Sequence, residues 1–60
     1  MHWINIEDRV INLDCLQMFK WSDGTLYLYI LGLSVPEMFD DPQGVLYSDL
    51  IKHIERMMNR

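Results

Sequence analysis

Apolar and polar residues alternate over residues 2–6, and this pattern in a segment rich in aromatic and branched side chains predicts a strand. The polar residues Glu7, Asp8 and Arg9 follow and predict a chain reversal, after which residues 10–12 return as a second short strand. Asn12 and Asp14 predict a bend at its end, because both side chains can bond to nearby backbone and compete with strand pairing.

Two apolar runs, residues 15–21 and 25–31, flank the sequence Ser22-Asp23-Gly24. Asp-Gly between apolar runs predicts a β-hairpin with a two-residue loop, because a type I′ turn needs a positive φ at both central positions. One face is expected to carry the cross-strand pairs Trp21–Leu26, Phe19–Leu28 and Gln17–Ile30. The other face is expected to carry Ser22–Thr25, Lys20–Tyr27, Met18–Tyr29 and Leu16–Leu31. A three-residue loop would shift the register by one residue and still leave both faces largely apolar.

The C-terminal part of the chain predicts an edge strand and a helix. Residues 33–39 suit an edge strand, with Pro36 at a position that need not donate a hydrogen bond. A helix is expected to start with Asp41 as its N-cap and Pro42 as its first residue. Its apolar stripe comprises Leu46, Leu50, Ile54 and Met57, widened by Val45, Ile51 and Met58. Lys52, Arg56 and Arg60 suit the negative end of the helix dipole.

These elements predict one domain over residues 1–60, of the α+β class: a three- or four-stranded antiparallel β-meander packed on one face by one C-terminal α-helix. A helix is roughly 10 Å across and strands lie about 4.8 Å apart, so one helix covers about two strands of one face. The opposite face would stay bare, and an apolar patch of several hundred Å² marks an interaction site. The residues expected at this interface are Leu16, Met18, Lys20, Tyr27, Tyr29 and Leu31.

Chain length and composition favour association over internal cross-links. A chain of 60 residues buries only about 60% of its unfolded surface, so small domains depend on disulfides, metals or partner subunits. The single cysteine, Cys15, excludes an intrachain disulfide. We therefore expect a homodimer or a higher homo-oligomer.

The charge pattern argues against nucleic-acid partners, and the length of the apolar runs argues against a membrane. The net charge is -4, and residues 1–44 hold seven acidic and two basic side chains. Such a surface repels phosphate backbones, whereas nucleic-acid binding requires a clustered basic face. Residues 26–31 form the longest apolar run, far short of the roughly 18 residues of a membrane helix, and residues 1–5 do not resemble a signal peptide. A cytoplasmic location is expected.

No residue pattern predicts catalysis, a metal or a cofactor. Asp49 and His53 are one helical turn apart and could form an acid–base pair, but no nucleophile motif accompanies them. Cys15 lacks a second cysteine at metal-binding spacing and suits a buried small apolar side chain. The acidic pairs Glu7-Asp8 and Asp40-Asp41 lack the spacing of a calcium loop. We expect no enzyme.

Several segments resemble small uncharacterised bacterial proteins that combine a β-meander with a C-terminal helix. The resemblance covers residues 10–16, the hairpin, residues 39–41 and the helical segment 50–56. Residues 11–31 also resemble flagellar FlbD-type proteins, but the longer connection before the helix argues against transferring a flagellar role. The resemblance implies a fold and supplies no catalytic residues.

The expected function is a small non-enzymatic homodimeric module for protein binding or assembly. The alternative is an acidic inhibitor or regulator that binds a basic surface of an enzyme or a DNA-binding protein.

Overall fold

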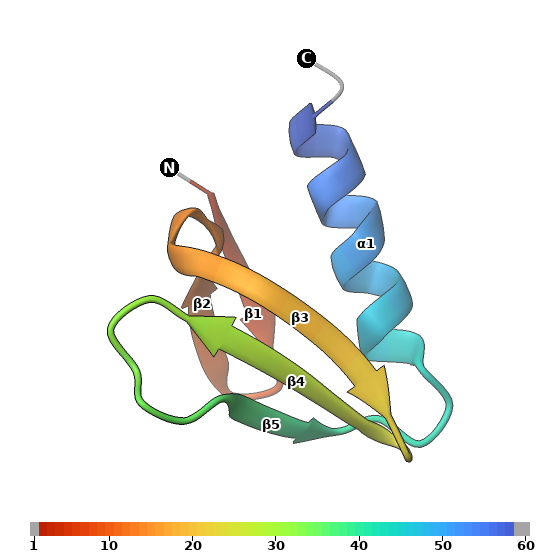
Figure 1. Cartoon of the computed structure of the whole chain (residues 1–60). Coiled ribbons are helices and arrows are strands. Elements are labelled where there is room, and N and C mark those ends of the chain that lie inside the picture. Colours follow the sequence, from red (N-terminus) through yellow and green to blue (C-terminus); the bar gives the residue numbers. More distant parts are fainter. Residues whose placement is uncertain (1, 59–60) are drawn as a thin grey trace.

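A computed structural model of the chain describes residues 2–58. Its elements are β1 (Trp3–Ile6), β2 (Arg9–Asn12), the 3₁₀ helix η1 (Leu13–Cys15), β3 (Leu16–Ser22), β4 (Thr25–Ile30), β5 (Glu37–Asp40) and α1 (Val45–Met58). β1 and β2 form a two-stranded antiparallel sheet, and β3, β4 and β5 form a three-stranded antiparallel meander in that order (Figure 1). The structure confirms the α+β class and the meander, and it places the N-terminal hairpin in a sheet of its own.

The inner face of the meander is covered by two elements together. Figure 1 shows β1, β2 and α1 on the same side of the three-stranded sheet. One buried cluster joins all three units: Ile4, Ile6, Ile11, Leu13, Leu26, Leu28, Phe39 and Leu50. The sequence predicted that the helix alone would cover this face. Since one helix is about two strands wide, the isoleucines of the N-terminal hairpin cover what the helix leaves open.

The central hairpin follows the predicted register from its turn as far as Met18. Asp23 and Gly24 have φ values of 51° and 75°, as a type I′ turn requires. Beyond Met18 a β-bulge shifts the register, so that Leu16 lies opposite Ile30 and not opposite the predicted Leu31. The expected pairing of Gln17 with Ile30 is wrong for the same reason, because Gln17 is the extra residue of the bulge.

β5 is the predicted edge strand, but it is shorter than expected. Glu37–Asp40 pairs antiparallel with β4, whereas residues 33–36 form the loop that precedes it. Pro36 therefore lies outside the ladder, where its missing N–H costs no strand hydrogen bond.

The helix begins at Val45, three residues after the predicted start at Pro42. Pro42, Gln43 and Gly44 form a turn that the Gly44 N–H closes onto the Asp41 carbonyl at 3.1 Å. Asp41 still caps the helix, because its carboxylate accepts the Leu46 N–H at 3.1 Å and the Tyr47 N–H at 3.0 Å. Arg56 lies in the last turn as predicted, and Arg60 lies outside the described residues.

Asp41 also ties the helix start to the meander through its backbone. Its N–H donates to the Gly24 carbonyl at 2.8 Å, and its carbonyl accepts the Trp21 indole N–H at 2.7 Å. The residue is 3% exposed, so these bonds form away from water. A single buried residue thus connects the turn of the central hairpin, the end of β5 and the first turn of α1.

We predict that Asp41→Ala lowers the free energy of unfolding by about 1–2 kcal/mol, because two N–H groups of the first helical turn lose their acceptor. Urea unfolding followed by circular dichroism measures this loss. Asp8→Ala is the matched control, since Asp8 lies in an exposed turn, and it should change the value by no more than about 0.5 kcal/mol. Equal effects of the two substitutions would contradict the capping role of Asp41.

Candidate functional site

The outward face of the meander carries a patch that no described element covers. Alternation along β3 and β4 brings four of the predicted interface residues, Met18, Lys20, Tyr27 and Tyr29, to this face. Met38 of β5 lies opposite Tyr27 and completes the set, which we call the outer patch. Met18 is 51% exposed and Met38 56% exposed, so the patch presents flexible apolar side chains to solvent.

Met38 is absent from the predicted interface residues because the pairing of the last strand was not known. Once β5 is registered against β4, the pair Tyr27–Met38 follows, and Phe39 turns inward to the core. The signal available in the sequence was the geometry of a strand, which places the neighbours Met38 and Phe39 on opposite faces.

Two of the predicted interface residues lie outside the outer patch. The bulge turns Leu16 toward the core, where it packs against the buried cluster, so its predicted place on the bare face is wrong. Leu31 follows β4 in the connecting loop and is 65% exposed. The same loop also exposes Leu33 and Val35, so the apolar surface of this region extends beyond the strands.

Lys20 lies against the aromatic part of the outer patch. Its Nζ atom is 5.1 Å from the centroid of the Tyr27 ring, within the range of a cation–π contact. The aliphatic stem of a lysine in this position covers apolar surface while the charge stays in water. Lys20 is therefore compatible with an apolar surface.

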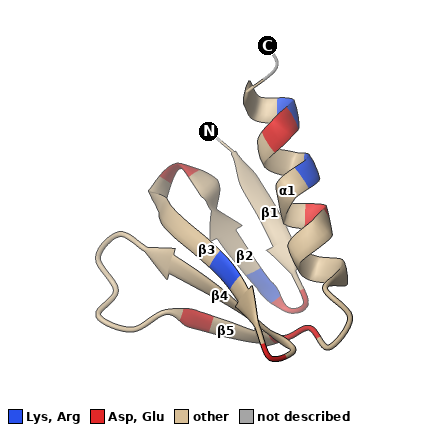
Figure 2. Ribbon diagram, turned by 45° about the vertical axis from the view of Figure 1, so that its right-hand side comes forward, with Lys and Arg blue, Asp and Glu red and all other residues tan. Residues whose placement is uncertain are grey.

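Acidic side chains gather at the end of the molecule where α1 begins. Figure 2 shows acidic segments at the β1–β2 turn, at the β3–β4 turn and in the connection from β5 to α1, all on the lower side of the view. The exposed residues concerned are Glu7, Asp8, Asp23 and Asp40. The fold thus concentrates charges that are spread over the sequence, and we call this region the acidic end.

A groove runs between α1 and the edge of β1 that does not pair with β2. It has a volume of about 280 Å³ and is lined by Ile4, Asn5, Ile6, Leu46, Asp49, Lys52, His53 and Arg56. Its lining includes residues from both faces of β1 and none from β2, so it lies at the free edge of the strand. We call it the β1 groove, and it holds two of the five basic side chains of the chain.

A second groove lies on the other flank of α1, beside β3. It has a volume of about 340 Å³ and is lined by Leu13, Leu16, Gln17, Met18, Phe19, Ile54 and Met57. No charged side chain lines it, so it differs in chemistry from the β1 groove.

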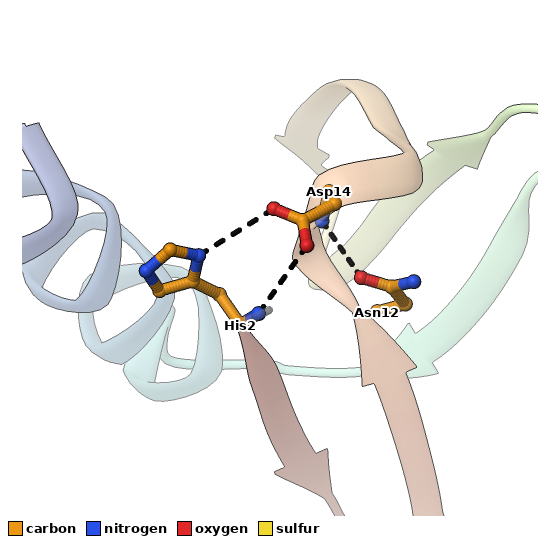
Figure 3. Close-up of polar contacts among 3 residues, drawn as sticks. All are labelled: His2, Asn12 and Asp14. Carbon is orange, nitrogen blue, oxygen red and sulfur yellow. Dashed lines mark hydrogen bonds and ion pairs between the residues drawn. The ribbon is translucent and has the colours of Figure 1, made fainter.

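Among the described residues, the ion pair that includes a histidine joins His2 and Asp14. Figure 3 shows the His2 ring directed at Asp14, with 3.4 Å between Nδ1 and Oδ1, and the His2 backbone N–H donates to Oδ2 at 3.4 Å. The Asn12 side chain in turn accepts the Asp14 N–H at 2.9 Å and caps η1. These contacts anchor the start of β1 to η1, and no hydroxyl or thiol is hydrogen-bonded to His2 among residues 2–58.

The other residues considered for catalysis or metal binding do not form a common site. Asp49 and His53 both line the β1 groove, but the hydrogen bonds of the described residues include none between them. Cys15 is a free, half-buried thiol. Within residues 2–58 no three His, Cys, Asp or Glu side chains are grouped closely enough to hold a metal ion. The same residues include no helix that is both long and apolar enough to cross a membrane.

Comparisons with protein-family models, with curated proteins and with solved structures gave no match. The resemblance to bacterial meander proteins and to flagellar FlbD-type proteins therefore stays a prediction from the sequence.

We predict that His2→Ala lowers the free energy of unfolding by less than about 1 kcal/mol, because exposed pairs contribute little in water. Urea unfolding at neutral pH measures the change. A loss of several kcal/mol would show that the anchoring of β1 depends on this side chain.

Proposed function

We propose that the protein is a small non-enzymatic module for protein binding or assembly that forms a homodimer through its outer patch. The observation that carries the proposal is the contrast between the two faces of the meander. The inner face is packed by α1 and the N-terminal hairpin, whereas Met18 and Met38 on the outer face are more than half exposed. Aromatic residues and methionine are the side chains enriched at protein interfaces.

A second copy of the chain suits this face by the positions of its charges. Lys20 lies on β3 at one edge of the meander, and Asp40 lies on β5 at the other edge, both on the outer face. A twofold axis parallel to the strands, between two meanders packed face to face, places β3 of each copy over β5 of the other. Lys20 of each copy then lies over β5 of the other, two residues along the strand from Asp40, so that its long side chain reaches toward this carboxylate at the rim of an interface with an apolar centre.

The single cysteine supports a cytoplasmic location for this module. Cys15 has no disulfide partner within the chain, and free thiols persist in reducing compartments.

We predict that Met18→Glu and Met38→Glu each convert a dimer into a monomer of 7.2 kDa, because a charge in a desolvated interface is costly. Light scattering coupled to size-exclusion chromatography at micromolar concentration measures the mass. Val10→Glu is the matched control: Val10 is 62% exposed on a strand of the other sheet, and this variant should remain dimeric.

The orientation of the dimer has a test within the same experiment. Lys20→Asp should weaken the dimer, and the further change Asp40→Lys should restore it. A monomeric wild-type protein, or a Met38→Glu variant as dimeric as the wild type, would contradict the proposal.

A second candidate function rests on the acidic end. Four exposed carboxylates, on two turns and at the end of β5, suit the basic surface of an enzyme or a DNA-binding protein, on which this chain would act as an inhibitor or regulator.

For this candidate we predict that binding of a lysine-rich peptide weakens at least tenfold as the salt concentration rises from low to physiological, because the charges are exposed. Fluorescence anisotropy measures the affinity. Asp23→Asn keeps a residue that tolerates the positive φ of this turn and should weaken binding, whereas Asp49→Asn, away from the acidic end, should not. Affinity that is indifferent to salt would contradict a charge-driven role.

A further inference from the structure

The β1 groove combines an unpaired strand edge with a pair of cations. The Leu13 N–H donates to the His2 carbonyl at 2.8 Å, which makes His2 and Leu13 a hydrogen-bonded pair of the first hairpin. In antiparallel sheets such pairs alternate with pairs that share no hydrogen bond. By this alternation the N–H and C=O groups of Trp3 and Asn5 point away from β2 at the free edge of β1, and Asn5 lines the groove.

An edge of this kind accepts a further strand. Backbone N–H and C=O groups in a row, spaced as in a ladder, pair with an extended peptide in the mode known as β-augmentation. A two-stranded sheet is also marginal by itself, so a third strand adds to its stability. Among the free strand edges, the edge of β1 is flanked by a groove with charged walls, whereas the groove beside β3 is lined by uncharged side chains.

The side chains that line the β1 groove determine which type of peptide can bind as the added strand. Lys52 and Arg56 are one helical turn apart on α1, and neither takes part in the ion pairs found among the described residues, His2–Asp14 and Arg9–Glu37. Asp49 is the only acidic side chain in the lining, so the cations outnumber it. Ile4, Ile6 and Leu46 add an apolar floor. A peptide in which carboxylates alternate with small apolar side chains matches both the two cations and the apolar residues of the groove.

We propose that the β1 groove binds an acidic peptide segment of another protein, in extended conformation, as a third strand beside β1. Lys52 and Arg56 bind its carboxylates, and the backbone of Trp3 and Asn5 binds its main chain. The two cations lie on α1 in a chain whose net charge is -4, so the groove attracts a class of ligand that the rest of the surface repels. None of these residues belongs to the outer patch, so the site does not depend on the proposed dimer.

The probe is a fluorescein-labelled peptide of seven residues that alternates glutamate and valine and is blocked at both ends. We expect saturable binding to the full chain, followed by fluorescence anisotropy, and at least about tenfold weaker binding of a peptide with glutamine in place of glutamate. Lys52→Gln and Arg56→Gln should each weaken binding of the glutamate peptide by about tenfold. Gln43→Glu is the matched control, because it changes the net charge by the same one unit at a residue outside the groove, and it should leave the affinity within about twofold.

Amide hydrogen exchange locates the peptide. At saturating peptide the Trp3 and Asn5 amides should exchange at least about tenfold more slowly. The Val10 amide, which points outward from the opposite edge of the same sheet, should change far less. Equal affinity for the glutamate and glutamine peptides, unchanged affinity of both groove variants, or unprotected Trp3 and Asn5 amides would each overturn the proposal. The mass of the protein without peptide is measured in parallel, so a failure of the dimer is recognised separately.

Discussion

The junction at Asp41 is the constraint on which the arrangement of the other elements depends. One buried residue accepts two N–H groups of α1 with its carboxylate, donates to the central hairpin turn and accepts the Trp21 indole. These bonds fix the start of the helix at the turn end of the meander. From that point α1 rises beside β1 and β3 (Figure 1). Side chains of α1 line a groove with β1 and a second groove with β3.

Coverage of the meander explains why one face is closed and the other open. A single helix is too narrow for three strands, and the N-terminal hairpin contributes Ile4, Ile6 and Ile11 to the same core. Arg9 extends this cover to the edge strand, where its guanidinium lies over the Phe39 ring and pairs with Glu37. Among the described residues, α1 and the N-terminal hairpin thus both pack on the inner face of the meander, and no element packs on the outer patch.

Local signals in the sequence were sufficient for the central hairpin, because Asp23-Gly24 specifies its turn and the turn fixes the register as far as Met18. The bulge at Gln17 was not predictable, since strand alternation carries no mark of an inserted residue, and it moved Leu16 from the proposed interface to the core. Asp41 was recognised as the cap, but the turn that separates it from Val45 depends on the Gly24 and Trp21 contacts, which are tertiary. The acidic excess of residues 1–44 was recognised, but its gathering at one end of the molecule and the β1 groove were not, because both are assembled from residues distant in sequence.

The central claim is that the outer patch is closed by a second copy of the chain, and the contacts across that interface test it most directly. In a mixed sample of isotope-labelled and unlabelled protein, intermolecular nuclear Overhauser effects report only protons that are close across two copies. For a dimer closed through the outer patch, such effects are expected between the Met38 methyl of one copy and the Tyr27 and Tyr29 rings of the other. Their absence in a sample with native fold, or their appearance only at Trp3 and Val10 of the other sheet, would contradict it.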